Sequence, residues 1–396
     1  MKRINNILFY SLFLALAACT EPYPIATLEF DDLLVVESTI TNELKRQLVK
    51  LSRTSGLNGF GQVVVDNANV SVEDSNGGVF DFSQDTETGY YMSNSEFQAM
   101  PDITYILKID TQNGQSYSSR AVTLTPVVEM DRVYPELRTE DGKEGVRIFI
   151  DVDNINGMGE YFRYEYEETY EILLPNTSGI SWAIIDTDDF TRTYDIVLAT
   201  KRIDEKCYST IESGGIIQTS TSNLGENRVV RYPLRFISKV DPIIKEQYSI
   251  LVKQYVQSQE AYTFYQILED LGNVENLLSQ GQPGFVSGNI NSEADPKKKV
   301  LGFFEVSSVS SKRIFFNYKD FGFVLPPYFV ECEVLSIEGR PEVLKRKLQF
   351  ENYEIFKYEV HIISESERIE IYHIAKSECT DCTSFSTHIK PDFWEE

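Results

Sequence analysis

The sequence predicts a mainly β protein, in which an N-terminal immunoglobulin-like or transthyretin-like β-sandwich precedes a larger β-rich domain with one helical insertion. Three observations support this fold class. Short runs of alternating or β-branched residues recur along the chain, and turn residues separate them about every 8–12 residues in the first domain. Only one long region has the apolar spacing of a helix. The length of 396 residues agrees with two domains.

The first 18 residues are predicted to be a secretory signal. Lys2 and Arg3 form a positive start, and an apolar run over residues 7–18 follows, interrupted only by Ser11. As a helix this run would rise only about 18 Å, which is too short for a hydrocarbon core of roughly 30 Å. We therefore expect residues 1–18 to be removed as a signal peptide.

Residues 16–19, Leu-Ala-Ala-Cys, resemble a bacterial lipobox, which predicts acyl chains on Cys19 and contact with membrane lipid through them. A chance cysteine after an ordinary signal peptide is the alternative. Thr20 in place of Asp favours the outer membrane, by analogy with enterobacterial sorting. Residues 19–32 are expected to be an extended tether, since two prolines and four acids lie in this stretch. Such early acids also occur in surface-export signals of Bacteroidota lipoproteins, so we expect the cell-surface face.

Residues 33–125 are predicted to form the β-sandwich. LLVVESTI from residue 33 is β-branched and apolar, and QLVKLSRT from residue 47 alternates. The Asn76-Gly77 and Asn113-Gly114 dipeptides are typical of the turns that join hairpin strands. Pro126 is expected to close this domain.

Residues 126–396 are assigned to the larger domain. Its most distinctive segment is YFRYEYEETYEILLP, residues 161–175. As a strand, it would place Tyr161, Arg163, Glu165, Glu167 and Thr169 on one face and Phe162, Tyr164, Tyr166 and Glu168 on the other. A helix is the alternative, because short aromatic and acidic runs are ambiguous.

The helical insertion is predicted over residues 242–280. Asp241 is a candidate N-cap, Pro242 suits a first turn, and Gly272 is a natural stop. Tyr262, Tyr265, Leu268 and Leu271 have helical spacing. Alternatively, YSILVKQYV is a strand that leads into a helix from about Ser258.

Composition and motifs exclude several functions. The chain has 37 Lys and Arg against 61 Asp and Glu, a formal charge of −24, which argues against nucleic acid as a partner. No GxSxG elbow, P-loop or dinucleotide fingerprint occurs, so we predict no enzyme and no cofactor. The stretch Asp151–Glu160 fails as a calcium loop because Ile155 stands at position 5. Glu165, Glu167 and Glu168 are the only support for a glycosidase, and we interpret them as chance neighbours.

His361 and His373 lie in strand-like stretches that can neighbour each other. Zinc needs three or four converging ligands, and neither HxH nor HExxH occurs, so no metal site is predicted.

Four cysteines follow Cys19, namely Cys207, Cys332, Cys379 and Cys382. An even number in an exported chain predicts up to two disulfides, with three connectivities open. Cys379 and Cys382 form a CxxC, which is redox-active in some proteins. Because it lies in a polar loop after a strand, we expect a structural link of the C-terminal tail.

Several segments, in this order, resemble a Bacteroidota lipoprotein family defined by a domain of unknown function, DUF4249. They include LVVESTIT at 34–41, ITYILKID at 103–110, YFRYEYEETYE at 161–171, QPGFVSGNI at 282–290 and ECTDC at 378–382. The resemblance implies an outer-membrane lipoprotein commonly encoded beside a SusC-like TonB-dependent receptor. It implies a non-enzymatic accessory or substrate-capturing partner of that transporter, and it carries over no catalytic residue.

The alternatives are a structural or assembly lipoprotein of the cell envelope without small-molecule cargo, and a hydrolase supported only by its carboxylates. For ligand contact, Trp182 is the first candidate, because an aromatic ring in a polar segment offers a large contact area. A strand-edge tryptophan is its structural alternative. Trp394 is expected to dock the C-terminal tail.

Overall fold

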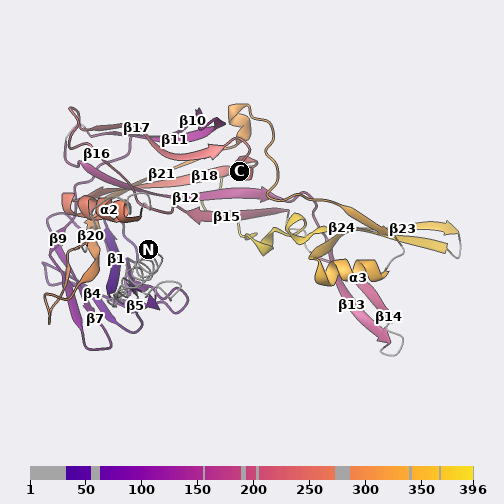
Figure 1. The fold of residues 1–396 in the computed structure, drawn as a ribbon, viewed down its shortest axis with the longest axis horizontal. Coiled ribbons are helices and arrows are strands. Elements are labelled where there is room, and N and C mark those ends of the chain that lie inside the picture. Colours follow the sequence, from indigo (N-terminus) through magenta and orange to yellow (C-terminus); the bar gives the residue numbers. More distant parts are fainter. Residues whose placement is uncertain are drawn as a thin grey trace, which may run out of the picture.

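The computed structural model describes residues 33–54, 63–154, 157–188, 193–201, 205–272, 286–338, 341–364 and 367–395. The signal, the tether and Cys19 lie outside the described residues. The structure is 52% strand and 11% helix, with two α-helices among the described residues, so the prediction of a mainly β protein is confirmed. Figure 1 shows a body of two β units, the first at the lower left and the second above it, and an arm that extends to the right.

The first unit is one sheet of 11 strands in the order β19-β8-β7-β4-β5-β6-β2-β1-β20, with β3 beside β2 and β9 beside β7. Tyr117 and Ile290 near one end of this path share a core cluster with Leu34 and Phe304 at the other end. The sheet therefore folds over a common core, which is compatible with the predicted sandwich. Its strands are β1 (Leu34–Thr41), β2 (Leu48–Arg53), β3 (Val63–Val64), β4 (Asn69–Asp74), β5 (Val79–Gln84), β6 (Tyr91–Ser93), β7 (Thr104–Asp110), β8 (Ser116–Ser119), β9 (Val122–Thr123), β19 (Ile290–Ser292) and β20 (Val300–Ser307).

Two of these strands come from far along the chain. β20 pairs with β1 in parallel, from Leu34 opposite Val300 to Thr41 opposite Ser307. β19 pairs antiparallel with β8. The run of residues 33–125 is thus completed by strands that come after most of the second unit, of whose described strands only β21 (Val309–Phe316) follows them.

The second unit is built from two sheets, β10-β11-β17 and β15-β12-β18-β21, with β16 beside β12. Phe162 on β12 and Ile250 on β18 share a core with Ile148 on β11, so these faces of the two sheets pack together. The strands are β10 (Arg132–Glu140), β11 (Lys143–Asp153), β12 (Tyr161–Leu173), β15 (Lys206–Glu212), β16 (Ile217–Ser220), β17 (Arg228–Ser238), β18 (Tyr248–Gln257) and β21 (Val309–Phe316). The strand prediction for residues 161–175 is confirmed, and the helical alternative is wrong.

Of the predicted helical insertion over 242–280, residues 273–280 lie outside the described residues, and residues 242–272 are only partly helical. Pro242–Ile244 form a 3-10 turn (η1), and the side chain of Asp241 accepts a hydrogen bond from the Ile243 N–H, as expected of an N-cap. β18 then forms because its residues are buried on both faces between β12 and β21. The helix itself is α2 (Gln259–Gly272), which agrees with the alternative interpretation of this region. A second helix, α3 (Pro341–Phe350), was not predicted.

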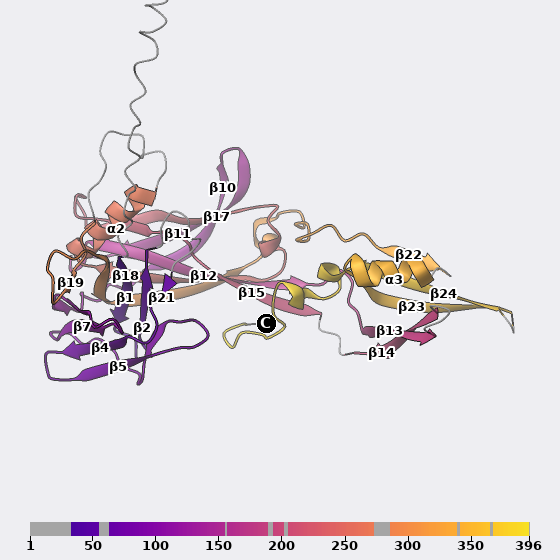
Figure 2. The same cartoon turned by 60° about the horizontal axis from the view of Figure 1, so that its bottom comes forward.

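The arm combines β13 (Ile180–Asp188) and β14 (Thr193–Thr200) with α3 and a three-stranded sheet, β22 (Leu335–Glu338), β24 (Glu367–Lys376) and β23 (Tyr353–Ser364). It has its own small core, which includes Leu344 of α3 and Ile355 of β23. Figures 1 and 2 show that this arm projects away from the body along the longest axis of the molecule.

Two disulfides lie at the base of the arm. Cys207 on β15 pairs with Cys382, and Cys332 pairs with Cys379. The two cysteines of the CxxC are therefore bonded to different partners, in agreement with a structural role. No helix among the described residues is long and apolar enough to cross a membrane.

Candidate functional site

A cavity of about 700 Å³, which we call the interdomain cavity, lies between the two β units. Its walls come from β1 and β20 of the first sheet, from α2, and from β12 and β18 of the second unit. This volume is within the usual range for small-molecule sites. The lining combines the apolar side chains Val35, Phe264, Leu268, Leu301 and Phe303 with the polar or charged side chains Thr39, Arg163, Glu165, Tyr255 and Tyr265.

Strand alternation places these side chains. In β1, Leu34 and Val36 enter the core of the first sheet, so Thr39 belongs to the opposite face. The parallel register sets Thr39 opposite Glu305 of β20, and neighbours across a ladder share a face. On β12, Arg163 is opposite Tyr255 of β18. The packing of Phe264 of α2 against Phe303 closes the site.

Arg163 is the centre of the site, and only 8% of it is exposed. Its Nη2 lies 3.4 Å from Oε2 of Glu305, whose side chain is 2% exposed, and 3.4 Å from the Thr39 hydroxyl. Its Nη1 donates to Glu165. The guanidinium lies 4.4 Å from the ring centre of Tyr255 and 5.3 Å from that of Tyr265. A cation over aromatic faces is attracted by the ring quadrupoles.

Four groups of the cavity, namely Arg163, Glu165, Tyr255 and Tyr265, have pKa values shifted away from neutrality. Burial acts to raise the pKa of Glu165, but the charge of Arg163 and the hydrogen bond from Tyr255 outweigh it, and the pKa is lowered. Burial raises the pKa values of Tyr255 and Tyr265. Although burial acts in the opposite direction, the charge of Glu305 helps to raise the pKa of Arg163. The site thus holds permanent charges and permanent hydroxyl donors.

Two polar atoms at this centre have no partner within the described part of the chain, Nε of Arg163 and Oε1 of Glu305. A buried donor or acceptor without a partner costs about 1–3 kcal/mol, so such atoms favour the entry of a polar group. One is a donor and the other an acceptor. Of these two residues, Arg163 lines the cavity and Glu305 does not.

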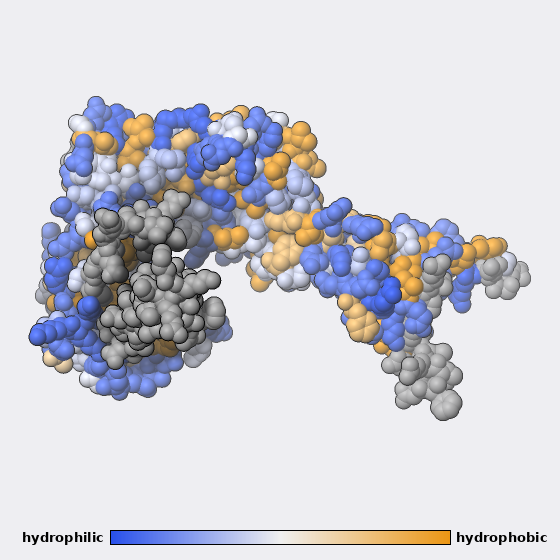
Figure 3. All heavy atoms as spheres, in the orientation of Figure 1, coloured by the Kyte–Doolittle hydropathy of each residue, from blue (hydrophilic) through white to orange (hydrophobic). Residues whose placement is uncertain are grey.

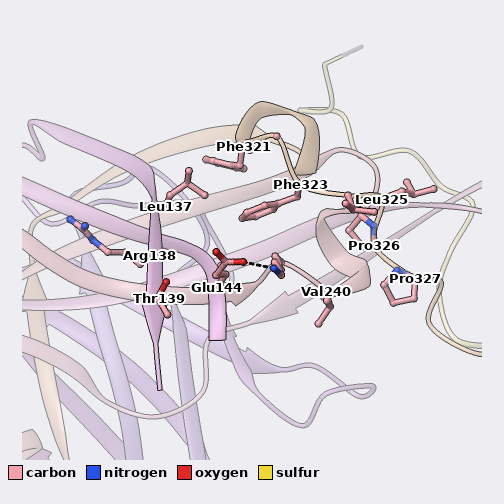
Figure 4. A pocket seen from close by; sticks show the side chains of 14 residues that line it. Leu137, Arg138, Thr139, Glu144, Val240, Phe321, Phe323, Leu325, Pro326 and Pro327 are labelled. Carbon is pink, nitrogen blue, oxygen red and sulfur yellow. Dashed lines mark hydrogen bonds and ion pairs between the residues drawn. The ribbon is translucent and has the colours of Figure 1, made fainter. Parts of the chain in front are cut away.

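An apolar groove of about 780 Å³ lies elsewhere, where the loop after β21 meets the β10-β11 sheet. Figure 4 shows Phe321, Phe323 and Leu325 facing the same hollow as Leu137 and Val240. Glu144 accepts a hydrogen bond from Lys239 at its side, the dashed line in Figure 4. The groove is therefore mainly apolar, whereas the interdomain cavity brings charged and aromatic groups together.

The structure gives Trp182 a packing role. Its indole Nε1 donates a hydrogen bond of 2.6 Å to Glu354, and the ring packs against the arm core. It does not line the interdomain cavity. Trp394 is 6% exposed and contacts the rings of Tyr208 and Phe315, so it docks the C-terminal tail as expected.

The acidic candidates are bound to arginines. Asp151 pairs with Arg132, Glu167 with Arg313, and Glu168 with Arg235. Glu168 also accepts from the Tyr248 hydroxyl. Because Glu167 and Glu168 lie on opposite faces of β12, they do not form a catalytic carboxylate pair with each other.

His361 and His373 do neighbour each other, through Glu359. Their Nε2 atoms lie 3.3 Å and 3.6 Å from the Glu359 carboxylate. Among the described residues, no group of three or more His, Cys, Asp or Glu side chains is arranged to hold a metal ion.

We predict that Glu359 titrates at unusually low pH. The hydrogen bonds from Lys357, at 2.5 Å, and from His361 lower its pKa to about 2. Since the folded pKa is depressed, the stabilisation is present above pH 4.5, the ordinary value, and is lost as the pH falls towards 2. Side-chain carboxyl NMR should give a midpoint near pH 2, and Lys357→Met should raise it. Lys297→Met, between β19 and β20, should not change it; a wild-type midpoint near 4.5 would refute the prediction.

The fold and cavity define a β protein of two packed units with a ligand-sized polar site between them. The chain belongs to the DUF4249 family, a domain of unknown function, whose sequence profile matches residues 20–313. This range includes every residue described above at the cavity and ends before β22. The resemblance noted from the sequence is therefore confirmed at the level of the family.

A solved structure of a DUF4785 family protein from Legionella pneumophila subsp. pneumophila strain Philadelphia 1 is also similar to this chain. The identity is 7% and the TM-score is 0.17; the similarity covers 55% of this chain and 50% of the other. The chain thus spans about half the length of that protein. No curated protein matches the sequence.

Proposed function

We propose that the protein is a lipid-anchored, non-enzymatic lipoprotein of the outer membrane that captures a ligand in the interdomain cavity for a SusC-like TonB-dependent transporter of a Bacteroidota cell. The ligand-sized cavity, with Arg163 over the rings of Tyr255 and Tyr265, supports the capture of a ligand, and the shifted pKa values agree with it. Acid–base catalysis works best with a group whose pKa lies near the operating pH. Here every cavity group with a shifted pKa is moved away from neutrality, which suits binding by charge, ring and hydrogen bond.

The anchoring step predicts a large effect of one substitution. Cys19→Ser removes the thiol that carries the acyl chains, so the protein should leave the outer-membrane fraction and keep its signal residues. Thr20→Ala should behave as the wild type. Fractionation of cells and intact-mass measurement check both. If Cys19→Ser protein still sediments with the outer membrane and has the same mass shift as the wild type, the anchor is refuted.

The transporter step is tested by co-purification. A tagged lipoprotein, extracted in mild detergent, should bring down the receptor barrel encoded beside it. Deletion of the lipoprotein should then give a growth defect on particular nutrients. A general envelope defect, with no barrel in the purified sample, would favour the assembly role instead.

A further inference from the structure

In the far half of the β23-β24 hairpin, the two strands pair with no other strand among the described residues. β22 pairs with β24 only from Ile371 to Ile374. Beyond this point β24 pairs with β23 alone, and no described strand pairs with the outer edge of β23. We call residues 360–364 and 367–370 the distal ribbon. A two-stranded ribbon is only marginally stable in water, and free edges present unpaired N–H and C=O groups to other chains.

The distal ribbon exposes large apolar side chains. Val360 is 44% exposed, Ile362 80% and Ile363 58%. Along β23 the exposure rises from buried Tyr353 and Ile355 to five consecutive exposed residues, 360–364. Figures 1 and 3 place this end of the arm farthest from the body, with hydrophobic side chains near its end. Apolar side chains at a protruding free edge are typical of a binding element.

The charges of the chain and the free strand edge favour another protein, over lipid or a second copy, as the partner of the distal ribbon. In the sequence, residues 364–367 are Ser-Glu-Ser-Glu, and charged carboxylates oppose insertion into hydrocarbon. A second copy of the chain carries the same charge of −24, so two copies repel each other. A free strand edge is instead complementary to an extended segment of another protein, which satisfies its main-chain groups while side-chain pockets supply specificity.

The base of the arm supports such a role. The disulfides Cys207–Cys382 and Cys332–Cys379 join the chain segments that connect the arm to the body. At the near end of β23, the Ser178 hydroxyl donates to the Ile355 carbonyl at 2.7 Å. An arm that is fixed to the body presents the free edge of β23 in one orientation. This reduces the conformational entropy that is lost when a partner binds.

We propose that the distal ribbon is the docking element for the transporter, and that an extended segment of the transporter adds as a strand along the free edge of β23. This inference rests on the proposed function, because it takes the transporter as the partner. It adds the site of contact and the mode of recognition, neither of which the anchor or the cavity implies.

The test compares two double variants of the tagged, full-length lipoprotein. Ile362→Asp/Ile363→Asp places carboxylates on the distal ribbon. Leu224→Asp/Val230→Asp places them at residues of the body that are 58% and 62% exposed. The ribbon variant should lower the transporter recovered per lipoprotein by about tenfold or more. The body variant should recover the wild-type amount, and thermal unfolding should stay within about 2 °C for both, since all four positions are on the surface.

Recovery by the ribbon variant within about twofold of the wild type overturns the docking site and leaves the proposed function intact. No recovery by the wild type itself overturns both. Hydrogen exchange of the complex should show new protection of the amides of residues 358–364; unchanged exchange there overturns strand addition. Two further measurements use unlipidated Cys19→Ser protein. Light scattering gives its oligomeric state, and flotation with vesicles of outer-membrane lipid measures its binding to lipid. If the protein forms a dimer that the ribbon substitutions abolish, the distal ribbon serves self-association and the proposal is overturned. If it binds vesicles and the same substitutions abolish that binding, the distal ribbon binds lipid and the proposal is likewise overturned.

Discussion

Arg163→Met is expected to lower the free energy of unfolding by about 3–5 kcal/mol, the usual cost of removing one partner from a buried ion pair. The substitution leaves Glu305, 2% exposed, without its counter-charge and removes the cation from Tyr255 and Tyr265. Because the pair joins β12 to β20, the loss weakens the contact between the two β units. Thermal and denaturant unfolding measure the effect.

A double variant separates the charge from the packing. Arg163→Met/Glu305→Leu should cost less than Arg163→Met alone, since no uncompensated carboxylate then remains in the interior. Arg138→Met removes a surface partner of Glu136 and should change the stability by less than about 1 kcal/mol. Equal effects of Arg163→Met and Arg138→Met would contradict this account of the site.

Loss of the Cys207–Cys382 disulfide is expected to cost more than loss of Cys332–Cys379. The first closes a loop of 175 residues and the second a loop of 47. The chain-entropy relation gives about 5 kcal/mol for the longer loop and about 4 kcal/mol for the shorter. Cys207 and Cys382 are also buried in the core of the second unit, so serine at these positions adds the cost of burying hydroxyls.

The comparison uses Cys207→Ser/Cys382→Ser against Cys332→Ser/Cys379→Ser, each unfolded by denaturant under oxidising conditions. The remaining disulfide in each variant serves as an internal control for oxidation. An equal or larger loss in the second variant would show that native packing, and not loop length, determines the stabilisation. Mass spectrometry of peptides from the wild type should detect no Cys379–Cys382 link.

Local patterns predicted much of the β architecture. Alternation identified β12 and assigned Arg163 and Phe162 to opposite faces, and the cap at Asp241 was correct. The error over residues 245–257 has a physical cause. β18 is buried on both sides, and a continuous apolar run without alternation cannot distinguish a central strand from a buried helix. The helix α3 was missed because its apolar face is narrow and polar residues such as Lys345, Arg346 and Lys347 dominate it.

The candidate site was not predicted, because its parts are distant in sequence. Arg163, Tyr255, Tyr265 and Glu305 come from four elements, and only tertiary packing brings them together. One signal was present: an arginine on a face of a strand rich in aromatic residues requires a partner if that face is buried. Trp182 was predicted as a ligand contact because it is an isolated aromatic residue in a polar segment. Its indole instead donates a hydrogen bond to Glu354 within the arm.

The parallel pairing of β1 with β20 has a consequence for biogenesis. The strand that begins the described chain cannot complete its sheet until residue 307 is available, so the N-terminal unit cannot finish folding during synthesis of its own segment. Contacts between residues so distant along the chain slow folding. The chain loses conformational entropy when the intervening loop closes, before the strand pairing contributes any stabilisation. A nascent chain therefore keeps the edge of β1 open for longer, and an unpaired strand edge of this kind is prone to aggregation.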